Sequence, residues 1–298
     1  MKALTFSKFG SANVLEYVDV PTPQIGDNEV LIAMNAIGPN YADIYRRRGN
    51  YHLEGAPPYI AGYEGAGVVV ESKSRMFRSG DAVAFADVPF ANAEYVLAPE
   101  THLIPLPNDV DCLTAASMLL QGLTAHYLST DSHDVQPNEL VVIHAASGGV
   151  GQILTQICKM KGAVVIGLTR NENKLETIES NGADYALILD DDWRSQIKRI
   201  TDNRGVDVAY DSVGSTLAGS IEVTKDCGHI VFCGMSGGDP DPVDPRALLD
   251  TSKTLTGGDL WSYLTSHEER IRRAHMLFDG NSSGKILLIP DSYTQPAA

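Results

Sequence analysis

The fold of this chain is decided by the stretch Val141-Val142-Ile143-His144-Ala145-Ala146-Ser147-Gly148-Gly149-Val150-Gly151. Its apolar first part predicts a buried strand, its small residues predict a tight turn, and its last part predicts the start of a helix. Gly148 lets the backbone approach a pyrophosphate, and Gly151 lets the helix pack closely on the sheet. The residues expected to hold the cofactor phosphates at this helix N-terminus are Ser147, Gly148, Gly149, Val150 and Gly151.

This turn departs from the strict dinucleotide motif G-x-G-x-x-G, because Ala146 stands at the first glycine position. A glycine motif alone is weak evidence, so the interpretation depends on the strand before it and the helix after it. The plainer alternative is a structural turn that holds no ligand.

Strands and helices alternate regularly from Leu113 onward. The predicted elements are a helix at Leu113–Thr130, strands at Leu140–His144, Val164–Thr169, Tyr185–Leu189, Val206–Tyr210 and His229–Cys233, and helices at Gly149–Lys161, Lys174–Asn181, Asp192–Thr201 and Thr216–Lys225. Nearly continuous apolar strands separated by helices predict a parallel sheet that is covered on both faces. The fold class is therefore α/β, with a doubly wound parallel-sheet (Rossmann) domain.

The first third of the chain has a different pattern, with short β-branched runs interrupted by Gly and Pro. Its predicted strands are Lys2–Phe6, Val14–Val20, Val30–Ala36, Gly67–Glu71, Ala82–Phe85 and Ala93–Val96, with a short helix at Asn40–Arg48. We expect a β-rich domain at residues 1–112 plus 261–298, and the Rossmann domain at residues 113–260. Two further strands are predicted at Thr254–Leu260 and Lys285–Ile289, and the second of these is expected to return to the β-rich domain.

Composition limits the range of partners. The chain has 298 residues and a formal net charge of −15, so its surface repels nucleic-acid backbones and anionic lipids. Its four cysteines form no C-x-x-C pair, which favours free thiols in a reducing compartment. No leader-like apolar segment begins the chain and no run approaches a membrane span, so a cytoplasmic location is expected. The run Arg46–Arg48 is expected to be a solvated helix face with one buried arginine.

The residues after the second predicted strand of the Rossmann domain indicate which nicotinamide cofactor is bound. An NAD enzyme places an acidic residue there for the ribose 2′-hydroxyl, whereas this strand ends in Thr169 and Arg170, with Lys174 one helical turn on. Arg170 and Lys174 can pair a 2′-phosphate, so NADPH is the expected cofactor. Glu172 would repel a 2′-phosphate if its side chain turned inward, which is the one argument against NADPH here.

With these residues in view, the chain resembles the medium-chain dehydrogenases and reductases, and among them the quinone oxidoreductases related to zeta-crystallin. The resemblance covers nearly the whole chain and includes Ala36–Asp43, Gly62–Gly67, Gly80-Asp81, Gly122–Thr124, Ala145–Gly151, Tyr210–Gly214 and Gly284–Leu288. It implies a GroES-like β-rich domain beside the Rossmann domain. It also implies hydride transfer from NADPH to a small quinone.

The same resemblance implies that no metal takes part in the reaction. Zinc alcohol dehydrogenases of this superfamily use a cysteine and a histidine at the places held here by Asn40 and Tyr63, and neither replacement is a competent zinc ligand there. Without a Lewis acid, alcohol oxidation loses the charge that stabilises its alkoxide. Reduction of an electron-poor quinone or enone needs less polarisation, and therefore remains feasible.

The resemblance also suggests individual site residues. Asn40, Tyr45 and Tyr51 are the expected catalytic residues near the nicotinamide: the tyrosines stack on a flat acceptor or donate to an oxyanion, and Asn40 binds a carboxamide or carbonyl. Asp43 and Arg47 are expected to pair on one helix. The remaining cofactor residues are Asn40, Thr124, Thr169, Val213, Phe232, Gly234, Met235 and Ser236, and Tyr127 and Gly214 lie in the same segments. His144 is expected to be a buried strand histidine.

Alternative functions remain open at this point. The first alternative is an NADPH-dependent enone or enoyl reductase on the same scaffold, and the second is a non-catalytic nucleotide-binding protein. The second alternative is suggested because Glu269–Arg273 runs directly into Ala274–Phe278, where the family has additional elements. A homodimer is expected through an edge strand near Leu255–Leu260.

Overall fold

The computed structural model describes residues 1–278 of the chain, which divide into two compact units. The first unit comprises Met1–Leu120 together with the segment that begins at Leu264, and the second comprises Gln121–Tyr263. The sequence analysis placed the corresponding limits after residues 112 and 260. The predicted strand Lys285–Ile289 lies outside the described residues.

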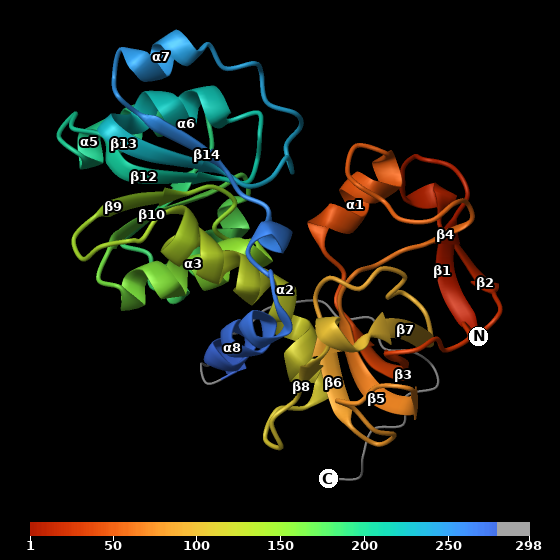
Figure 1. Ribbon diagram of the computed structural model, residues 1–298. Helices are drawn as coiled ribbons and strands as arrows, with labels where there is room; N and C mark the ends of the chain where they lie inside the picture. Colours follow the sequence, from red (N-terminus) through yellow and green to blue (C-terminus); the bar gives the residue numbers. More distant parts are fainter. Residues whose placement is uncertain (279–298) are drawn as a thin grey trace. The chain divides into compact units, whose positions relative to one another are not determined.

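The first unit is built from two antiparallel sheets (Figure 1). The smaller has the order β2-β1-β4, and the larger has the order β7-β3-β5-β6-β8. Its strands are β1 (Lys2–Phe6), β2 (Glu16–Asp19), β3 (Glu29–Ile37), β4 (Tyr59–Ile60), β5 (Gly65–Ser72), β6 (Ala82–Phe85), β7 (Tyr95–Pro99) and β8 (Ile104–Pro105). Alternate residues of these strands point inward and form an apolar core, with Val30, Ile32 and Met34 of β3 packed against Val83 and Phe85 of β6.

Three helices belong wholly or partly to this unit. Helix α1 (Tyr41–Arg48) follows β3, and α8 (His267–Phe278) is the last described element. Helix α2 (Cys112–Tyr127) begins in the first unit and ends in the second, and it continues as a π-helical turn at Leu128–Ser132. Short 3₁₀ turns occur at Ala12–Val14 and Glu100–His102.

The second unit is a six-stranded parallel sheet in the order β11-β10-β9-β12-β13-β14. Its strands are β9 (Leu140–Ile143), β10 (Val164–Thr169), β11 (Tyr185–Ile188), β12 (Val206–Asp211), β13 (Thr224–Phe232) and β14 (Thr254–Gly257). Every residue of the central strand β12 is buried, as expected for a strand covered on both faces. The predicted doubly wound α/β fold is confirmed.

Helices cover both faces of this sheet. Its helices are α3 (Gly149–Met160), α4 (Leu175–Ser180), α5 (Trp193–Ile200), α6 (Leu217–Val223) and α7 (Pro245–Leu249), with 3₁₀ turns at Glu172–Lys174 and Leu260–Ser262. Figure 1 shows α3 on one face and α5 and α6 on the other. Trp193 and Ile197 of α5 pack on Val142 of β9 and Ala209 of β12, which closes one half of the core.

The structure corrects two predicted boundaries. The predicted helix Thr216–Lys225 ends at Val223 and β13 starts at Thr224, because Thr224 pairs with Val206 ahead of an irregularity in the register between β12 and β13. The short helix α7 was missed, although Asp244 accepts from the Arg246 N–H as its N-cap and Pro245 stands at the first helical position. After α7, β14 forms one edge of the sheet, and the homodimer expected through this strand stays a prediction.

No helix among residues 1–278 is both long and apolar enough to cross a bilayer. Cys112, Cys158, Cys227 and Cys233 are all free thiols.

A buried ion pair holds α8 in the first unit. The Arg270 guanidinium donates to Asp87 Oδ2 from Nε at 3.0 Å and from Nη2 at 2.6 Å. The two side chains are only 11% and 6% exposed, so each charge depends on the other. Breaking such a pair leaves an uncompensated buried charge.

We expect Arg270→Leu to lower the free energy of unfolding by about 3 kcal/mol, because it leaves the Asp87 carboxylate buried without its partner. The matched control is Arg272→Leu, which removes a half-exposed guanidinium paired with Glu269 and is expected to cost less than about 1 kcal/mol. Urea unfolding followed by circular dichroism measures both variants. Equal losses would show that the Arg270–Asp87 pair does not stabilise the unit.

Candidate functional site

The carboxyl ends of β9, β10, β12 and β13 lie at one edge of the sheet in the second unit. The order of the strands reverses at β9, which has β10 on one side and β12 on the other. Ligands of open α/β sheets bind outside the carboxyl ends of the strands at such a reversal. Most of the predicted cofactor residues belong to the loops that leave this edge.

The turn between β9 and α3 has no room for a side chain at Gly151. Ala145 takes a left-handed backbone with φ of 50°, and the Gly148 N–H donates to the Ala145 carbonyl at 2.8 Å. A Cβ at Gly151 would overlap the carbonyl oxygen of Ala145 and the backbone of Ala146. Glycine is therefore required for α3 to begin this close to the sheet, and the first N–H groups of α3 are presented at its edge.

The end of β10 carries the predicted 2′-phosphate residues. The hydroxyls of Thr169 and Ser147 are 3.1 Å apart, so the last residue of β10 contacts the turn between β9 and α3. Arg170 is exposed, and its Nη2 donates to Ser215 Oγ at 3.4 Å. Lys174 and Glu172 are also exposed, in the 3₁₀ turn before α4.

The loops after β12 and β13 are bound to each other. The Gly237 N–H donates to the Val213 carbonyl at 2.8 Å, and Ser236 Oγ donates to the Ser212 carbonyl at 2.9 Å. The Gly258 N–H donates to the carbonyl of Phe232, the last residue of β13. The structure thus brings together a set of predicted cofactor residues at this edge, namely Ser147, Thr169, Arg170, Val213, Phe232, Gly234, Met235 and Ser236.

A buried carboxylate, which the sequence analysis did not single out, organises these loops. Asp211 is the last residue of β12 and is fully buried. Its Oδ1 accepts from the N–H groups of Val213 and Gly214, both at 2.9 Å. Its Oδ2 accepts from the hydroxyls of Thr216 at 2.8 Å and Ser220 at 2.7 Å. The carboxylate therefore sets the turn that carries Val213.

His144 completes this network from β9. Its Nε2 lies 2.9 Å from Ser220 Oγ, and because that hydroxyl donates to Asp211, it accepts from His144. Burial lowers the pKa of His144, while the Asp211 carboxylate acts in the opposite direction. Burial alone would raise the pKa of Asp211, but His144 and the bonds from Ser220, Gly214 and Thr216 hold it below its usual range. The network thus links the Asp211 carboxylate through the Ser220 hydroxyl to the His144 ring.

The network also reaches the backbone of the cofactor turn. Ser212 Oγ donates to the carbonyl of His144 at 3.3 Å, immediately before Ala145. The sequence analysis correctly expected His144 to be a buried strand histidine, since it is 1% exposed and its ring makes an edge contact with Trp193. The motif Tyr210–Gly214 was quoted for its family likeness, but its aspartate was not identified as the organising residue.

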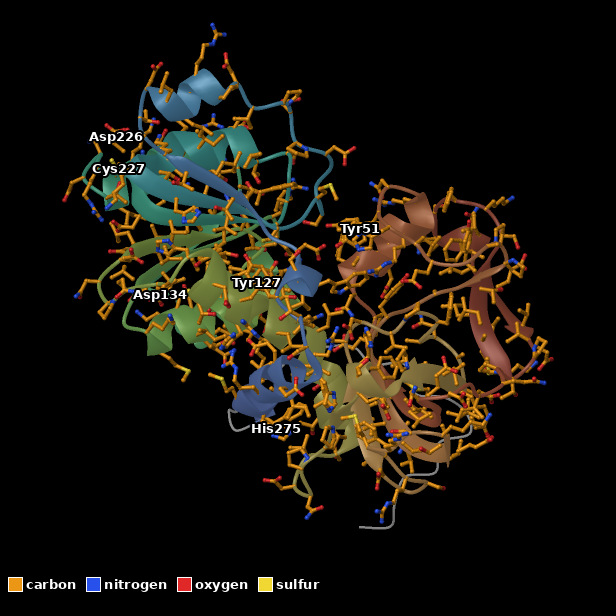
Figure 2. All side chains as sticks on the ribbon, in the orientation of Figure 1. Tyr51, Tyr127, Asp134, Asp226, Cys227 and His275 are labelled. Atoms are coloured by element: carbon orange, nitrogen blue, oxygen red, sulfur yellow. The ribbon has the colours of Figure 1, made fainter. Side chains whose placement is uncertain are left out.

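Helix α2 carries two further residues of the predicted cofactor segments. Thr124 is half-buried on this helix. Tyr127 lies inside the second unit (Figure 2), where its ring stacks on Tyr263 at 4.5 Å between centroids and 17° between planes. Tyr127 is 1% exposed, so its ring belongs to the core, and the expected contacts of Thr124 and Tyr127 with the cofactor stay predictions.

Asn40 begins helix α1 in the first unit. Its backbone N–H donates to Asp43 Oδ2 at 2.8 Å, which caps the helix. Its side-chain Nδ2 donates to the Gly38 carbonyl at 2.8 Å and to Glu64 Oε2 at 2.6 Å. The other oxygen of the fully buried Glu64 accepts from the Leu120 N–H at 2.8 Å. The amide hydrogens of Asn40 are thus directed at the protein, and its predicted contact with nicotinamide or substrate stays a prediction.

Tyr63, at one of the two places compared with zinc ligands in the sequence analysis, carries an arginine stacked on its ring. The Arg46 guanidinium lies 3.6 Å from the centroid of the Tyr63 ring and 5.1 Å from that of Tyr51. Burial raises the pKa of Tyr63, while the charge of Arg46 acts to lower it. The part of the chain that the structure describes contains no group of three or more His, Cys, Asp or Glu arranged to hold a metal ion.

The expected pairing of Asp43 with Arg47 is wrong. Asp43 Oδ1 instead accepts from Arg46 Nη1 at 3.1 Å, three residues along α1. Arg47 donates to the Gly10 carbonyl at 3.2 Å, so it ties α1 to the N-terminal strand region. Arg46 is buried and Arg48 is exposed, which confirms the expected helix face with one buried arginine.

The two tyrosines proposed as catalytic lie close together. The ring centroids of Tyr45 and Tyr51 are 6.2 Å apart with an edge-on geometry, and Tyr41 extends the cluster to an exposed ring. Tyr45 is 8% exposed, whereas Tyr51 is half-buried. Tyr51 therefore offers more surface to an acceptor than Tyr45 does, and the catalytic role of both stays a prediction.

Parts of both units match known protein families. The family description "Alcohol dehydrogenase GroES-like domain" matches residues 26–139, and "Zinc-binding dehydrogenase" matches residues 149–275. A 2-haloacrylate reductase from a Burkholderia species is 34% identical over 95% of this chain and 88% of its own length. A quinone oxidoreductase from Pseudomonas aeruginosa is 33% identical over 93% of this chain and 87% of its own length.

Solved structures agree with these relatives. The quinone oxidoreductase of Escherichia coli, solved as a complex with NADPH, superposes with a TM-score of 0.90 at 30% identity, covering 94% of this chain and 87% of its own. The quinone oxidoreductase of Pseudomonas syringae pv. tomato DC3000 superposes with a TM-score of 0.89 at 33% identity, covering 93% of this chain and 87% of its own. Both comparisons extend over the β-rich and the parallel-sheet unit.

We expect Asp211→Asn to weaken NADPH binding about tenfold and to lower stability by about 2 kcal/mol, because charge-assisted bonds to the Val213 turn are lost. The control is Asp134→Asn, since Asp134 is an exposed carboxylate paired with Lys161. Cofactor titration by fluorescence and thermal melting measure the two effects. A loss of stability with unchanged NADPH affinity would mean that Asp211 does not position the cofactor loops.

Proposed function

This chain belongs to the quinone oxidoreductase family of the medium-chain dehydrogenases and reductases, and we propose that it transfers a hydride from NADPH to a small, electron-poor acceptor. The chain covers most of the length of its relatives, including both regions that the family requires. We propose a quinone as the acceptor, as in the names of the P. aeruginosa and E. coli relatives.

The single observation that carries the choice of cofactor is the exposed cation at the end of β10. Arg170 forms no ion pair with a carboxylate anywhere in residues 1–278, and its one hydrogen bond, to Ser215, is long at 3.4 Å. A Cβ built on Gly237 would lie 2.8 Å from Arg170 Nη2, so the guanidinium lies against the loop after β13. A guanidinium held between two loops at the ligand edge suits a 2′-phosphate.

The remaining parts of the edge fit the rest of the same cofactor. The N–H groups at the start of α3 suit a pyrophosphate, and the turn at Gly151 lets it approach. The E. coli relative binds NADPH in its crystal structure, which supports the same cofactor here. Bound NADPH supplies the hydride, and the protein contributes orientation and exclusion of water.

The proposed reaction balances without a metal. One hydride and one proton convert a quinone to a hydroquinone as NADPH becomes NADP⁺. In the first unit, the tyrosine cluster at Tyr45 and Tyr51 supplies flat apolar surface for a planar acceptor, and the exposed part of that cluster is available for stacking. We propose that solvent provides the proton.

The alternative acceptor is an activated alkene. The 34% identical relative is named 2-haloacrylate reductase, and acrylates carry a carbon–carbon double bond conjugated with a carboxyl group. Hydride addition at the β-carbon and protonation at the α-carbon would reduce that bond with the same cofactor geometry. The third alternative, nucleotide binding without turnover, is motivated by the single continuous helix α8 that spans the shortened segment at Arg273-Ala274.

The decisive measurement follows nicotinamide absorbance for the purified protein with a panel of quinones, enones and 2-haloacrylates. We expect oxidation of NADPH that requires a quinone, with far less oxidation of NADH. Turnover of alkenes without quinones would select the alkene reductase. Tight NADPH binding with no turnover of any acceptor would select the binding protein.

We expect Arg170→Ala to lower kcat/KM for NADPH by about 10- to 100-fold, as for the loss of a hydrogen-bonded charge pair, while NADH is used unchanged. The control is Arg199→Ala, since Arg199 is an exposed arginine paired with Asp192 on the same unit. Steady-state kinetics with each nucleotide measure the difference. Equal losses for both nucleotides would contradict a role in 2′-phosphate recognition.

A further inference from the structure

The second unit has a polar cavity at the sheet edge opposite to the cofactor loops. Gly205 precedes β12, Thr224 and Lys225 begin β13, and Lys253 precedes β14. In a parallel sheet these amino ends share one edge, while Ser147, Arg170 and Val213 follow the carboxyl ends. The cavity measures about 440 Å³. Asp226 and Cys227, labelled in Figure 2, mark the strand start beside it.

Four cations converge on this cavity from separate segments. Lys198 comes from α5, Arg204 from the turn after α5, Lys225 from the start of β13, and Lys253 from the residue before β14. The carboxylates that face them are Glu222 and Asp226 in the lining and Asp207 at the start of β12. The four cations exceed these three carboxylates by one positive charge, in a chain whose formal net charge is −15.

Three of these cations are already paired. Lys198 Nζ lies 2.5 Å from Glu222 Oε1. Arg204 Nη2 and Lys225 Nζ lie 2.8 Å and 2.5 Å from the two oxygens of Asp207. These pairs fix the positions of the cationic groups around the cavity, and Asp207 is shared between two of them.

Lys253 is the cation without a carboxylate partner. Its Nζ donates to the Ile221 carbonyl at 2.8 Å, and it forms no ion pair within the described residues. Burial lowers the pKa of Lys253, while Asp226 and Glu222 act more weakly in the opposite direction. An ammonium group has three donors, so two N–H bonds of Lys253 remain for a ligand in the cavity.

We propose that this cavity binds the phosphate group of a small phosphorylated molecule, with Lys253 as its principal partner and Lys225 and Arg204 beside it. A phosphate offers several acceptor oxygens and compensates the excess charge. Glu222 and Asp226 in the lining repel a long polyanion, which favours a small molecule as the occupant.

The site is separate from the cofactor edge but is linked to the same strands. Asp207 Oδ2 accepts from the N–H of Leu140, the first residue of β9, at 2.7 Å. An anion that draws Lys225 or Arg204 toward the cavity therefore acts on the amino ends of β9 and β12. The carboxyl ends of these two strands carry the cofactor turn and Asp211.

The test is isothermal titration of the full chain with inorganic phosphate, pyrophosphate and, for comparison, citrate. In the Arg170→Ala variant, which lacks the cation of the cofactor edge, we expect one site per chain for pyrophosphate, with a dissociation constant below about 1 mM. Lys253→Gln is expected to weaken it at least tenfold, whereas Lys253→Arg, which keeps the charge, retains it. Lys161→Gln, a lysine paired with Asp134 outside the cavity, is the matched control and is expected to bind as the wild type does.

Arg170→Ala separates this site from the cofactor edge, since phosphates are also expected to bind there. Pyrophosphate binding that persists in Arg170→Ala and is lost when Lys253→Gln is added to it supports the proposal, whereas binding that persists in the double variant overturns it. Binding lost in Arg170→Ala but kept in Lys253→Gln overturns it, as does the absence of any binding. Citrate bound as tightly as pyrophosphate overturns the choice of phosphate as the ligand chemistry.

Discussion

The buried carboxylate of Asp211 is the constraint on which the ligand edge of the parallel sheet depends. A charge at the end of a fully buried strand is costly unless every acceptor site is used. Here four donors meet it, two from the backbone of the following turn and two from the hydroxyls of Thr216 and Ser220. Because the Asp211 carboxylate needs these four hydrogen bonds, it determines the path of the chain after β12 and the position at which α6 starts.

That requirement extends through Ser220 to His144, and so to the strand that enters the cofactor turn. The same edge has a second constraint, because Gly151 leaves no space between α3 and the turn. Together, the hydrogen bonds of Asp211 and the close packing at Gly151 fix the two loops that a dinucleotide would touch. Contacts within the protein hold both loops in shape, so a dinucleotide would bind to a preorganised site.

The first unit handles buried charge differently. Arg46 is compensated by the Asp43 carboxylate and by the face of Tyr63, and Arg270 is compensated by Asp87. Arg46 stacks on Tyr63, the residue that was compared with a metal ligand of zinc dehydrogenases in the sequence analysis. The buried Glu64 carboxylate accepts hydrogen bonds from the Asn40 amide and the Leu120 N–H.

The alternation of strands and helices, the glycine turn before α3 and the cation at the end of β10 could all be predicted from the amino-acid sequence. These are local features, since periodicity and steric limits act over a few neighbouring residues. The folded structure was needed to show that Asp43 pairs with Arg46, that Asp211 accepts from the turn after β12 and from α6 and is linked to His144 of β9, and that four cations meet at one cavity. The link to His144 and the meeting of the four cations depend on packing between segments far apart in the chain. The Asp43–Arg46 pair is local, but its choice over Arg47 depends on which neighbour the folded backbone brings within reach.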